Sequence, residues 1–198
     1  MKQNKFSIAI TGGIGSGKSI VCQWFNDQGI PVISADTLGH EALESPEVLK
    51  KLTEEFGESI ILNGNIDRHV LGNIVFDDAD KTARLNTITH PYIISRIKEM
   101  LESQKETLAV FEIPLLFEAG LENLFDKIVI VWANENVRVE RLKMRRGMNE
   151  RKISLIMAKQ YSQEAAKDRA DYVIVNNDSL EDLEKKLGEL YATLKQRM

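Results

Sequence analysis

The chain has 198 residues, enough for one domain with elaborations and a full hydrophobic core. Its composition is ordinary for a globular protein, and a net charge of −4 argues against a general nucleic-acid binder. We see neither an apolar stretch long enough to cross a membrane nor the pattern of a signal peptide. The single cysteine, Cys22, fits a small core residue in a reducing compartment. We therefore expect a cytoplasmic protein without nucleic-acid or membrane partners.

The first elements predicted are a strand, a glycine-rich loop and a helix. An apolar run at 6–10 suits a buried strand, and the glycine-rich loop follows it at 12–17. The helix after the loop should end at Gly29, where a left-handed C-cap is expected. A second short strand is predicted at 31–34.

The next stretch, up to residue 107, reads as helices only. Ser45 and Pro46 fit the N-cap and first position of a helix that ends near Gly57. Pro91 is expected to open another helix, because proline is tolerated in the first turn and disfavoured further inside.

Three further apolar runs, at 108–113, 127–132 and 172–175, are predicted to be strands. A charged helical stretch at 135–168 separates the last two of them. The five strands are nearly continuous in Ile, Val, Leu and Phe, which is typical of a parallel sheet covered on both faces.

The last helix begins with a predicted capping box formed by Ser179 and Asp182. Leucines spaced by three and four residues follow it, which could form a coiled-coil seam or a face that packs on the sheet. The stripe spans only about two heptads, so packing on the sheet is favoured. Its members are Leu180, Leu183, Leu187, Leu190 and Leu194.

We therefore predict an α/β fold of the P-loop type, with three layers and a five-stranded parallel sheet flanked by helices. The nucleotide-binding core comprises residues 1–36, 108–134 and 169–198. Residues 37–107 form a helical substrate-binding insertion, and residues 135–168 form a helical lid. Insertions at the ends of parallel strands commonly carry substrate sites.

Residues 12–19 read GGIGSGKS and match the phosphate-binding loop GxxxxGK[ST]. Glycines allow several backbone N–H groups to converge on phosphate oxygens, and the following helix adds its positive dipole end. Lys18 is predicted to reach the β- and γ-phosphates, and the Ser19 hydroxyl to ligate Mg²⁺. Because strand, loop and helix occur in the required order, this motif is a strong indication of nucleotide phosphate chemistry.

Other P-loop classes fit less well. Residues 36–39 spell DxxG, but they follow Lys18 by only eighteen residues and no NKxD element exists, which argues against a switch GTPase. An oligomeric ATPase would need a strong acidic pair at a strand end, where residues 108–112 offer only Glu112. A small-molecule kinase remains.

Asp36 follows the second strand at the carboxyl edge where α/β proteins bind ligands. Its carboxylate can orient an acceptor hydroxyl, since phosphoryl transfer needs positioning more than early deprotonation. A helix cap is the alternative for this residue. Catalysis and capping are equally compatible with the sequence up to this point.

Three arginines of the charged stretch share one helix face: Arg138, Arg141 and Arg145. Such a face could close over the γ-phosphate and stabilise its charge during transfer. It could instead be a solvated basic face or a nucleic-acid patch. The P-loop favours the lid.

The sequence resembles the dephospho-CoA kinase family over essentially its whole length and in order. The resemblance rests on TGGIGSGKS (11–19), VISAD (32–36), IDR (66–68), His90-Pro91, IPLLFE (113–118), the Arg141 and Arg145 helix, Gln160, and ADYVIVNN (170–177). The loop alone is generic, whereas HP, PLLFE and AD-x-VI-x-NN together are specific. The family implies transfer of the ATP γ-phosphate to the ribose 3′-hydroxyl of dephospho-CoA, with Mg²⁺. We expect a monomer or a weak homo-oligomer.

The resemblance also implies roles for individual residues. Catalysis would involve Asp36, Lys18 and Arg141, and acceptor binding would involve Asp36, Arg68 and Glu118, with the 37–107 insertion as the acceptor domain. ATP would contact Gly13, Ile14, Gly15, Ser16, Gly17, Lys18, Ser19, Ile20, Arg145, Asn176 and Asn177, the last two bordering the adenine.

The chain departs from the family pattern at three positions. Ser34 replaces a frequent first acid, Ile20 replaces a common threonine, and Glu112 stands at a commonly apolar position, where a metal role is left open. A nucleoside or nucleotide monophosphate kinase shares the loop, the acid and the arginine lid, and is the alternative function.

Overall fold

The computed structural model describes residues 5–75 and 78–197, with the side chains of Arg145 and Arg146 excepted. Its internal contacts divide the chain into two compact units. Unit 1 comprises residues 1–34 and 104–198, and unit 2 comprises residues 35–103. Across the described part of the chain, no helix is both long and apolar enough to span a membrane.

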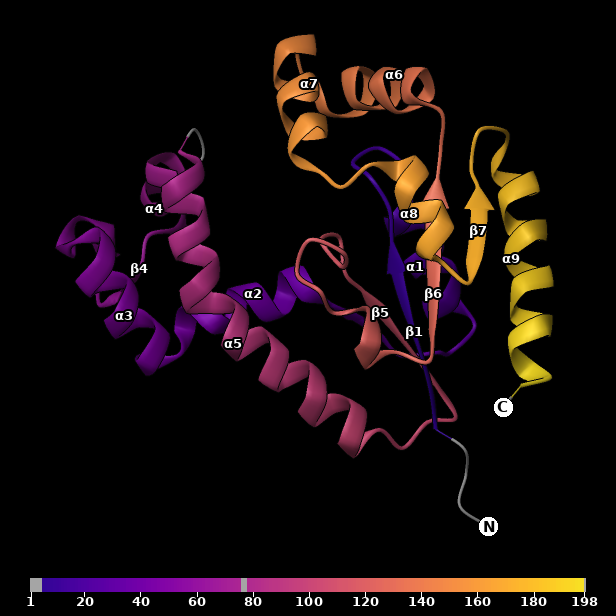
Figure 1. The fold of residues 1–198 in the computed structure, drawn as a ribbon, viewed down its shortest axis with the longest axis horizontal. Helices are drawn as coiled ribbons and strands as arrows, with labels where there is room; N and C mark the ends of the chain where they lie inside the picture. Colours follow the sequence, from indigo (N-terminus) through magenta and orange to yellow (C-terminus); the bar gives the residue numbers. More distant parts are fainter. Residues whose placement is uncertain (1–4, 76–77, 198) are drawn as a thin grey trace. The chain divides into compact units, whose positions relative to one another are not determined.

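Unit 1 contains the predicted five-stranded sheet, in which every paired strand is parallel to its neighbour (Figure 1). The strand order is β2-β5-β1-β6-β7. Their bounds are β1 (Phe6–Thr11), β2 (Val32–Ser34), β5 (Leu108–Glu112), β6 (Lys127–Trp132) and β7 (Tyr172–Val175). Continuous apolar runs therefore predicted both the number and the position of these strands, because both faces of the sheet are covered.

The register brings the carboxyl ends of three strands to one level. Glu112 at the end of β5 pairs with Ile10 of β1 on one side and with Ser34 of β2 on the other. The glycine-rich loop begins two residues after Ile10. The phosphate loop and the end of β2 thus belong to the same edge of the sheet, where open α/β sheets bind ligands.

One face of the sheet is covered by α1 (Lys18–Asp27) and α9 (Leu180–Lys195), which also contact each other. Figure 1 shows α9 running alongside β7. The side chains of α1 and α9 form one core with the inward residues of β1, β5, β6 and β7. Its fully buried members include Ile8, Ile10, Val21, Phe25, Val110, Val129, Val131, Leu187 and Leu194.

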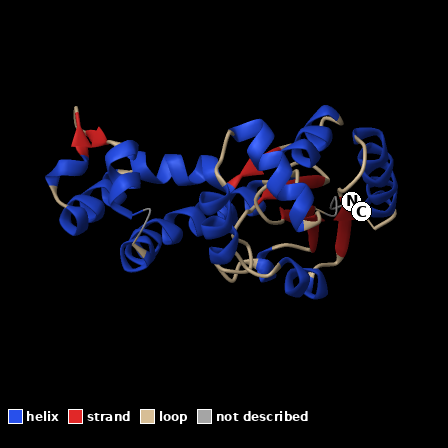
Figure 2. Cartoon of the chain, turned by 90° about the horizontal axis from the view of Figure 1, so that it is seen from above, coloured by secondary structure: helices blue, strands red, loops and turns tan. Residues whose placement is uncertain are grey.

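The other face is covered by α8 (Gln163–Arg169), which contacts β6, and by the segment after β5 with its short 3₁₀ turn (Glu122–Leu124). The rings of Phe111 and Phe125 meet there with centroids 5.2 Å apart. Helices α6 (Glu135–Arg146) and α7 (Glu150–Lys159) pack on each other before α8. Seen from above, the strands of the sheet lie between helices (Figure 2).

The predicted packing of the last helix is confirmed, with one exception. Leu183, Leu187, Leu190 and Leu194 are buried in the core of unit 1, whereas Leu180 is 57% exposed. The hydroxyl of Ser179 accepts a hydrogen bond from the N–H of Asp182, as expected of the N-cap residue in a capping box. Burial of four leucines on the sheet leaves no apolar seam for a coiled coil.

In its described residues, unit 2 contains a small hairpin, in which β3 (Ile61–Leu62) pairs antiparallel with β4 (Asn65–Ile66). Its helices are α2 (Ala35–Glu44), α3 (Pro46–Phe56), α4 (Arg68–Val75) and α5 (Ala79–Ser103). A 3₁₀ turn (Glu58–Ile60) precedes the hairpin. Their apolar side chains form a separate core around Val48, Leu52, Ile60, Ile66 and Leu71. The helix predicted from Ser45 and Pro46 to Gly57 is confirmed, although the Ser45 side chain makes no capping hydrogen bond.

Two predictions for this region are wrong. The stretch is not helical throughout, because Asn63 and Gly64 turn the chain with φ of 53° and 82° and close the hairpin visible in red at the left of Figure 2. An Asn-Gly pair is a strong signal for such a turn. Pro91 lies inside α5 and does not open it.

The start of α5 is set by Asp78, whose carboxylate accepts from the N–H of Lys81. Apolar side chains on both sides of Pro91, including Ile88 and Tyr92, pack against the core of unit 2. An interior proline costs about 3 kcal/mol, and this burial offsets the loss. The helix therefore continues through the proline.

Cys22 provides a test of the unit 1 core through its pH dependence. Burial, with a smaller contribution from Glu112, raises the pKa of its thiol from 9.0 to about 12. The folded state holds this proton more tightly than the unfolded state, so stability is retained below pH 9 and lost as pH rises toward 12. We expect the free energy of unfolding to fall by up to ~1.4 kcal/mol per pH unit in that window.

The measurement is urea unfolding of the wild type and Cys22→Ala at pH 8 to 11. The difference in stability between the two proteins should shrink as pH rises. A constant difference would contradict the account.

Candidate phosphate-binding site

The glycine-rich loop connects β1 to α1 in a conformation that requires glycine. Gly12, Gly15 and Gly17 have φ of 144°, 80° and 101°. A Cβ on Gly12 would lie 2.3 Å from the carbonyl oxygen of Val131, and one on Gly17 would lie 2.2 Å from Nδ2 of Asn176. The loop is thus pressed against the ends of the neighbouring strands, which fixes its turns and fits a phosphate nest.

The loop leads into the first turn of α1 with donors available for an anion. The N–H of Ser16 donates to Gly13 O, and the N–H groups of Ile20 and Val21 donate to Gly17 O. Within the described chain, no acceptor is found for the N–H groups of Gly15 and Gly17. Together with the dipole of α1, these groups form a local positive potential that suits phosphate oxygens.

Lys18 lies along the loop. Its Nζ donates to the carbonyl oxygens of Gly12 at 2.6 Å and Gly13 at 3.3 Å. The Ser19 side chain, in the first turn of α1, is exposed. The ammonium group is thus positioned beside the N–H groups of the nest.

The asparagines after β7 tie this strand to the loop. Nδ2 of Asn176 donates to Ser16 O at 2.8 Å in a buried contact, and Asn176 is 3% exposed. Oδ1 of Asn177 accepts from the N–H of Asn134 at 2.8 Å, at the start of α6. Both amides are therefore engaged within the protein. Their contact with adenine stays a prediction.

Removing the Asn176 amide should destabilise the loop. Asn176→Ala leaves the buried Ser16 carbonyl without its donor, so the free energy of unfolding should fall by about 1–3 kcal/mol. Asn177→Ala breaks an exposed hydrogen bond and should cost less than about 1 kcal/mol. Urea unfolding of the two variants measures the difference. Equal losses would show that the Asn176 contact does not hold the loop.

Arg141 of α6 is directed to the same segment. Its guanidinium donates through Nη1 to Asn176 O at 2.9 Å and through Nη2 to Asn176 Oδ1 at 3.4 Å. Arg141 thus connects α6 to the end of β7. Arg145 lies in the last turn of α6, but its side chain is outside the described residues, so its predicted contact with ATP stays a prediction.

The turn between α7 and α8 also reaches the loop. Oε1 of Gln160 accepts from the N–H of Ile14 at 2.8 Å, and Oε1 of Glu118 accepts from the N–H of Tyr161 at 2.7 Å. A small pocket lies beside Gly12 and Gly13 and is lined by Glu118, Gln160, Tyr161 and Gln163. Glu118 therefore lies in unit 1, whereas Arg68 lies in unit 2, and their joint role in acceptor binding stays a prediction.

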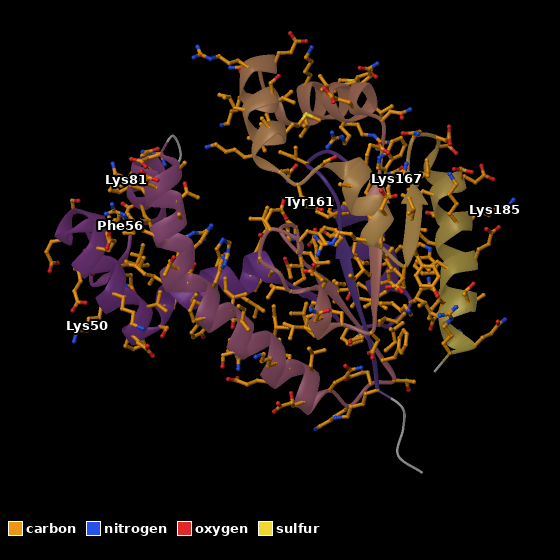
Figure 3. The ribbon with its side chains drawn as sticks, viewed as in Figure 1. Lys50, Phe56, Lys81, Tyr161, Lys167 and Lys185 are labelled. Atoms are coloured by element: carbon orange, nitrogen blue, oxygen red, sulfur yellow. The ribbon has the colours of Figure 1, made fainter. Side chains whose placement is uncertain are left out.

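Tyr161 is labelled in Figure 3, close to the segment that follows β5. Its ring lies 5.4 Å from the ring of Phe117, and the guanidinium of Arg169 lies 4.9 Å from the Phe117 ring. These contacts hold the α7–α8 turn in place. Nothing in the sequence pattern alone linked this turn to the loop, beyond the family resemblance at Gln160.

The two other predicted site residues belong to unit 2. Asp36 is the second residue of α2 and follows the last residue of β2, Ser34, by two positions; its side chain is exposed. No capping hydrogen bond of its carboxylate is found in the described structure. Arg68 begins α4, and its Nη2 lies 2.5 Å from Nε2 of His40. Unit 2 therefore brings two nitrogen-bearing side chains together, on α2 and α4.

No group of three or more His, Cys, Asp or Glu side chains able to hold a metal occurs among the described residues. A protein that binds Mg²⁺ mainly through substrate phosphates needs only one or two of its own oxygens. The exposed hydroxyl of Ser19 directly after the nest fits that requirement.

Comparisons with known proteins agree with this geometry. A family model described as dephospho-CoA kinase matches residues 6–182. A dephospho-CoA kinase of Bacillus licheniformis is 40% identical over 195 residues, covering 94% of this chain and 95% of that protein. One of Fusobacterium nucleatum is 38% identical over 188 residues, covering 94% and 97%.

Solved structures show the same fold. Dephospho-CoA kinase from Campylobacter jejuni superposes with a TM-score of 0.67 at 27% identity, covering 96% of this chain and 97% of that one. TT1252 from Thermus thermophilus superposes with a TM-score of 0.83 at 34% identity, covering 96% and 98%. A shikimate kinase from Acinetobacter baumannii, 11% identical with a TM-score of 0.59 and coverage of 98% and 96%, shares the fold alone.

Proposed function

The chain belongs to the dephospho-CoA kinase family, and we propose that it transfers the γ-phosphoryl group of ATP to the ribose 3′-hydroxyl of dephospho-CoA, giving CoA and ADP. The observation that supports this most strongly is a complete phosphate loop in a chain whose residues 6–182 match the dephospho-CoA kinase family model. Phosphoryl transfer relies on positioning and on charge stabilisation, and the loop offers both.

The phosphate loop carries the nucleotide part of this proposal. Backbone N–H groups of the loop and of the first turn of α1 bind the phosphates, with donors at Gly15 and Gly17 already oriented by the glycine turns. Lys18 moves from the carbonyl oxygens of Gly12 and Gly13 to the β- and γ-phosphates. Phosphate oxygens carry more charge than a carbonyl oxygen, so this exchange favours the bound nucleotide.

Mg²⁺ would be held by Ser19 together with the phosphates of ATP. When bound, the ion would supply positive charge that offsets the negative charge of the phosphates during transfer. Ser19 contributes a hard oxygen ligand next to the nest, on a rigid helix turn. Glu112 ends the neighbouring strand β5 at the same sheet edge.

Asp36 is assigned to the acceptor. Its carboxylate would accept a hydrogen bond from the ribose hydroxyl, orient its oxygen toward the γ-phosphorus and take the proton late in the transfer. The exposed position at the start of α2, without a capping bond in the described structure, leaves this carboxylate available. Arg68 and Glu118 are assigned to acceptor binding, and residues 135–168 to a lid over the nucleotide.

The wider setting of the enzyme follows from its surface and its cysteine. A free, buried cysteine supports a reducing, cytoplasmic compartment, and the net charge of −4 argues against nucleic-acid partners. The exposed large apolar side chains come from separate elements, which supports a monomer or a weak homo-oligomer. In the described chain these are Leu62, Leu115, Met144, Leu155, Val173 and Leu180.

An acceptor panel tests the proposal. ADP formation is followed with Mg²⁺-ATP and, in turn, dephospho-CoA, AMP, CMP, adenosine or no acceptor. We expect turnover above the blank with dephospho-CoA and a lower kcat/KM with every other acceptor. A preference for AMP or CMP would establish the alternative, a monophosphate kinase, and no turnover with dephospho-CoA would refute the assignment.

A further inference from the structure

Arg138 of α6 is a buried cation on the phosphate-loop side of unit 1. It lies in the first half of α6, is 7% exposed, and its Nε is buried without a hydrogen-bond partner. No ion pair of Arg138 occurs in the described part of the chain. Burial lowers the pKa of Arg138 below its usual range, and the opposing effect of Glu135, one turn earlier, is smaller.

The guanidinium lies directly on the phosphate loop. An ideal Cβ on Gly13 would be 2.2 Å from Nη1 of Arg138 and 2.1 Å from Nε2 of Gln163. Both amide atoms of Gln163 are buried and have no partner either. Two unpartnered polar side chains, one from α6 and one from the start of α8, therefore converge on the same loop residue.

The backbone of α6 fixes this arrangement. A Cβ on Gly15 would lie 2.9 Å from the carbonyl oxygen of Arg138 and 3.2 Å from its Cβ. The helix thus rests against the loop at Arg138 itself. One turn later, Arg141 is directed elsewhere, to the carbonyl oxygen of Asn176. The two arginines therefore have different surroundings although they share one helix face.

Burying a guanidinium without a partner lowers the stability of a protein, because the charge loses its hydration and gains no compensating interaction. A buried polar group without a partner in a native protein calls for an explanation, and a bound ligand with acceptor oxygens would supply one. The ligand required here is an anion with several acceptor oxygens, placed beside the loop at Gly13. The polyphosphate of a nucleotide meets that description.

We propose that Arg138 and Gln163 bind the β- or γ-phosphate of ATP, Arg138 through its guanidinium and Gln163 through its amide N–H. Arg141 instead positions the segment after β7 through Asn176. The inference rests on the proposed use of ATP. It adds Gln163 to the phosphate site, and it separates the role of Arg138 from that of Arg141, which the sequence had grouped on one helix face.

Nucleotide affinity, measured by calorimetry without any acceptor, tests this assignment. Arg138→Met should weaken binding of ATP about 10- to 100-fold and binding of AMP less than about threefold, because AMP lacks the contacted phosphates. Gln163→Leu should weaken ATP binding about 3- to 10-fold. Arg151→Met, at an exposed arginine of α7, is the control and should bind both nucleotides normally.

Thermal unfolding of the same variants separates a ligand contact from a structural one. Removing an uncompensated buried charge should leave the Tm of ATP-free Arg138→Met equal to or above that of the wild type. The rise in Tm on adding ATP should shrink in parallel with the affinity.

Two results would overturn the inference: an unchanged ratio of ATP to AMP affinity, or a lower Tm with normal ATP binding. Should Arg138→Met not fold, Arg138→Gln replaces it, and a wild-type affinity ratio there refutes the assignment. The binding measurement contains no acceptor, so its outcome is independent of the acceptor panel. If Arg138→Met lost ATP affinity but not AMP affinity, while the wild type failed to phosphorylate dephospho-CoA, the inference would stand and only the proposed acceptor would be refuted.

Discussion

Replacing Asp36 with asparagine is expected to lower kcat about 10²- to 10⁴-fold and to leave the Kd of ATP within about threefold of the wild type. Asparagine keeps the size of the side chain and one acceptor oxygen, but it has no negative charge and cannot take the proton of the acceptor hydroxyl. The nucleotide contacts lie in the phosphate loop of unit 1, so ATP binding should not depend on this carboxylate. Steady-state kinetics with dephospho-CoA and calorimetry with ATP measure the two quantities separately.

The matched control is Glu44→Gln, which removes one carboxylate from an exposed position at the end of the same helix. Its kcat should remain near that of the wild type. If Asp36→Asn also turned over at the wild-type rate, Asp36 would not be the orienting acid.

Lys18→Ala is expected to reduce kcat/KM about 10²- to 10³-fold and to weaken ATP binding as well. The ammonium group lies within hydrogen-bond distance of two loop carbonyl oxygens, so it is already beside the place where the phosphates bind. An arginine should not restore the rate, because its planar fork cannot replace a compact point charge in the closed loop. The kinetics of Lys18→Ala and Lys18→Arg test both statements.

Lys185→Ala is the control for the loss of one lysine. Lys185 lies on α9 and points away from the sheet (Figure 3), and it is exposed. Its kinetics should match those of the wild type. Thermal unfolding of Lys18→Ala accompanies the assay, and a folded variant with normal kcat/KM would remove Lys18 from the phosphate site.

The sheet and the phosphate loop could be predicted because both depend on local sequence. A strand buried on both faces must be apolar throughout, so runs such as 127–132 were recognisable at their observed bounds. The loop needs glycine at positions where the chain turns with positive φ, and GGIGSGKS fulfils that need within eight residues.

The errors arose where tertiary packing outweighs local preference. Pro91 is locally unfavourable within a helix, but α5 is held on both sides of it by the core of unit 2. The hairpin at Asn63 and Gly64 was missed because each of its strands is only two residues long. Its turn residues were the available signal.

The polar groups around the loop depended on contacts far apart in the chain. Gln160 binds the N–H of Ile14 across 146 positions, and Gln163 lies on Gly13 across a similar interval. The spacing of the sequence placed Arg138 and Arg141 on one helix face. It could not show that the Arg138 guanidinium is buried with an unpartnered Nε, whereas that of Arg141 donates to Asn176 O. That distinction required the folded structure.

The proposed acceptor, dephospho-CoA, is inferred from the family segments, whereas the phosphate loop by itself indicates only that a nucleotide is bound. The most direct test of the account is therefore the chemical structure of the product formed from Mg²⁺-ATP and dephospho-CoA, determined by mass spectrometry and phosphorus NMR. We expect one new phosphomonoester on the ribose 3′-hydroxyl and an equal amount of ADP. ADP without a phosphorylated acceptor, or a phosphate on another hydroxyl, would contradict it.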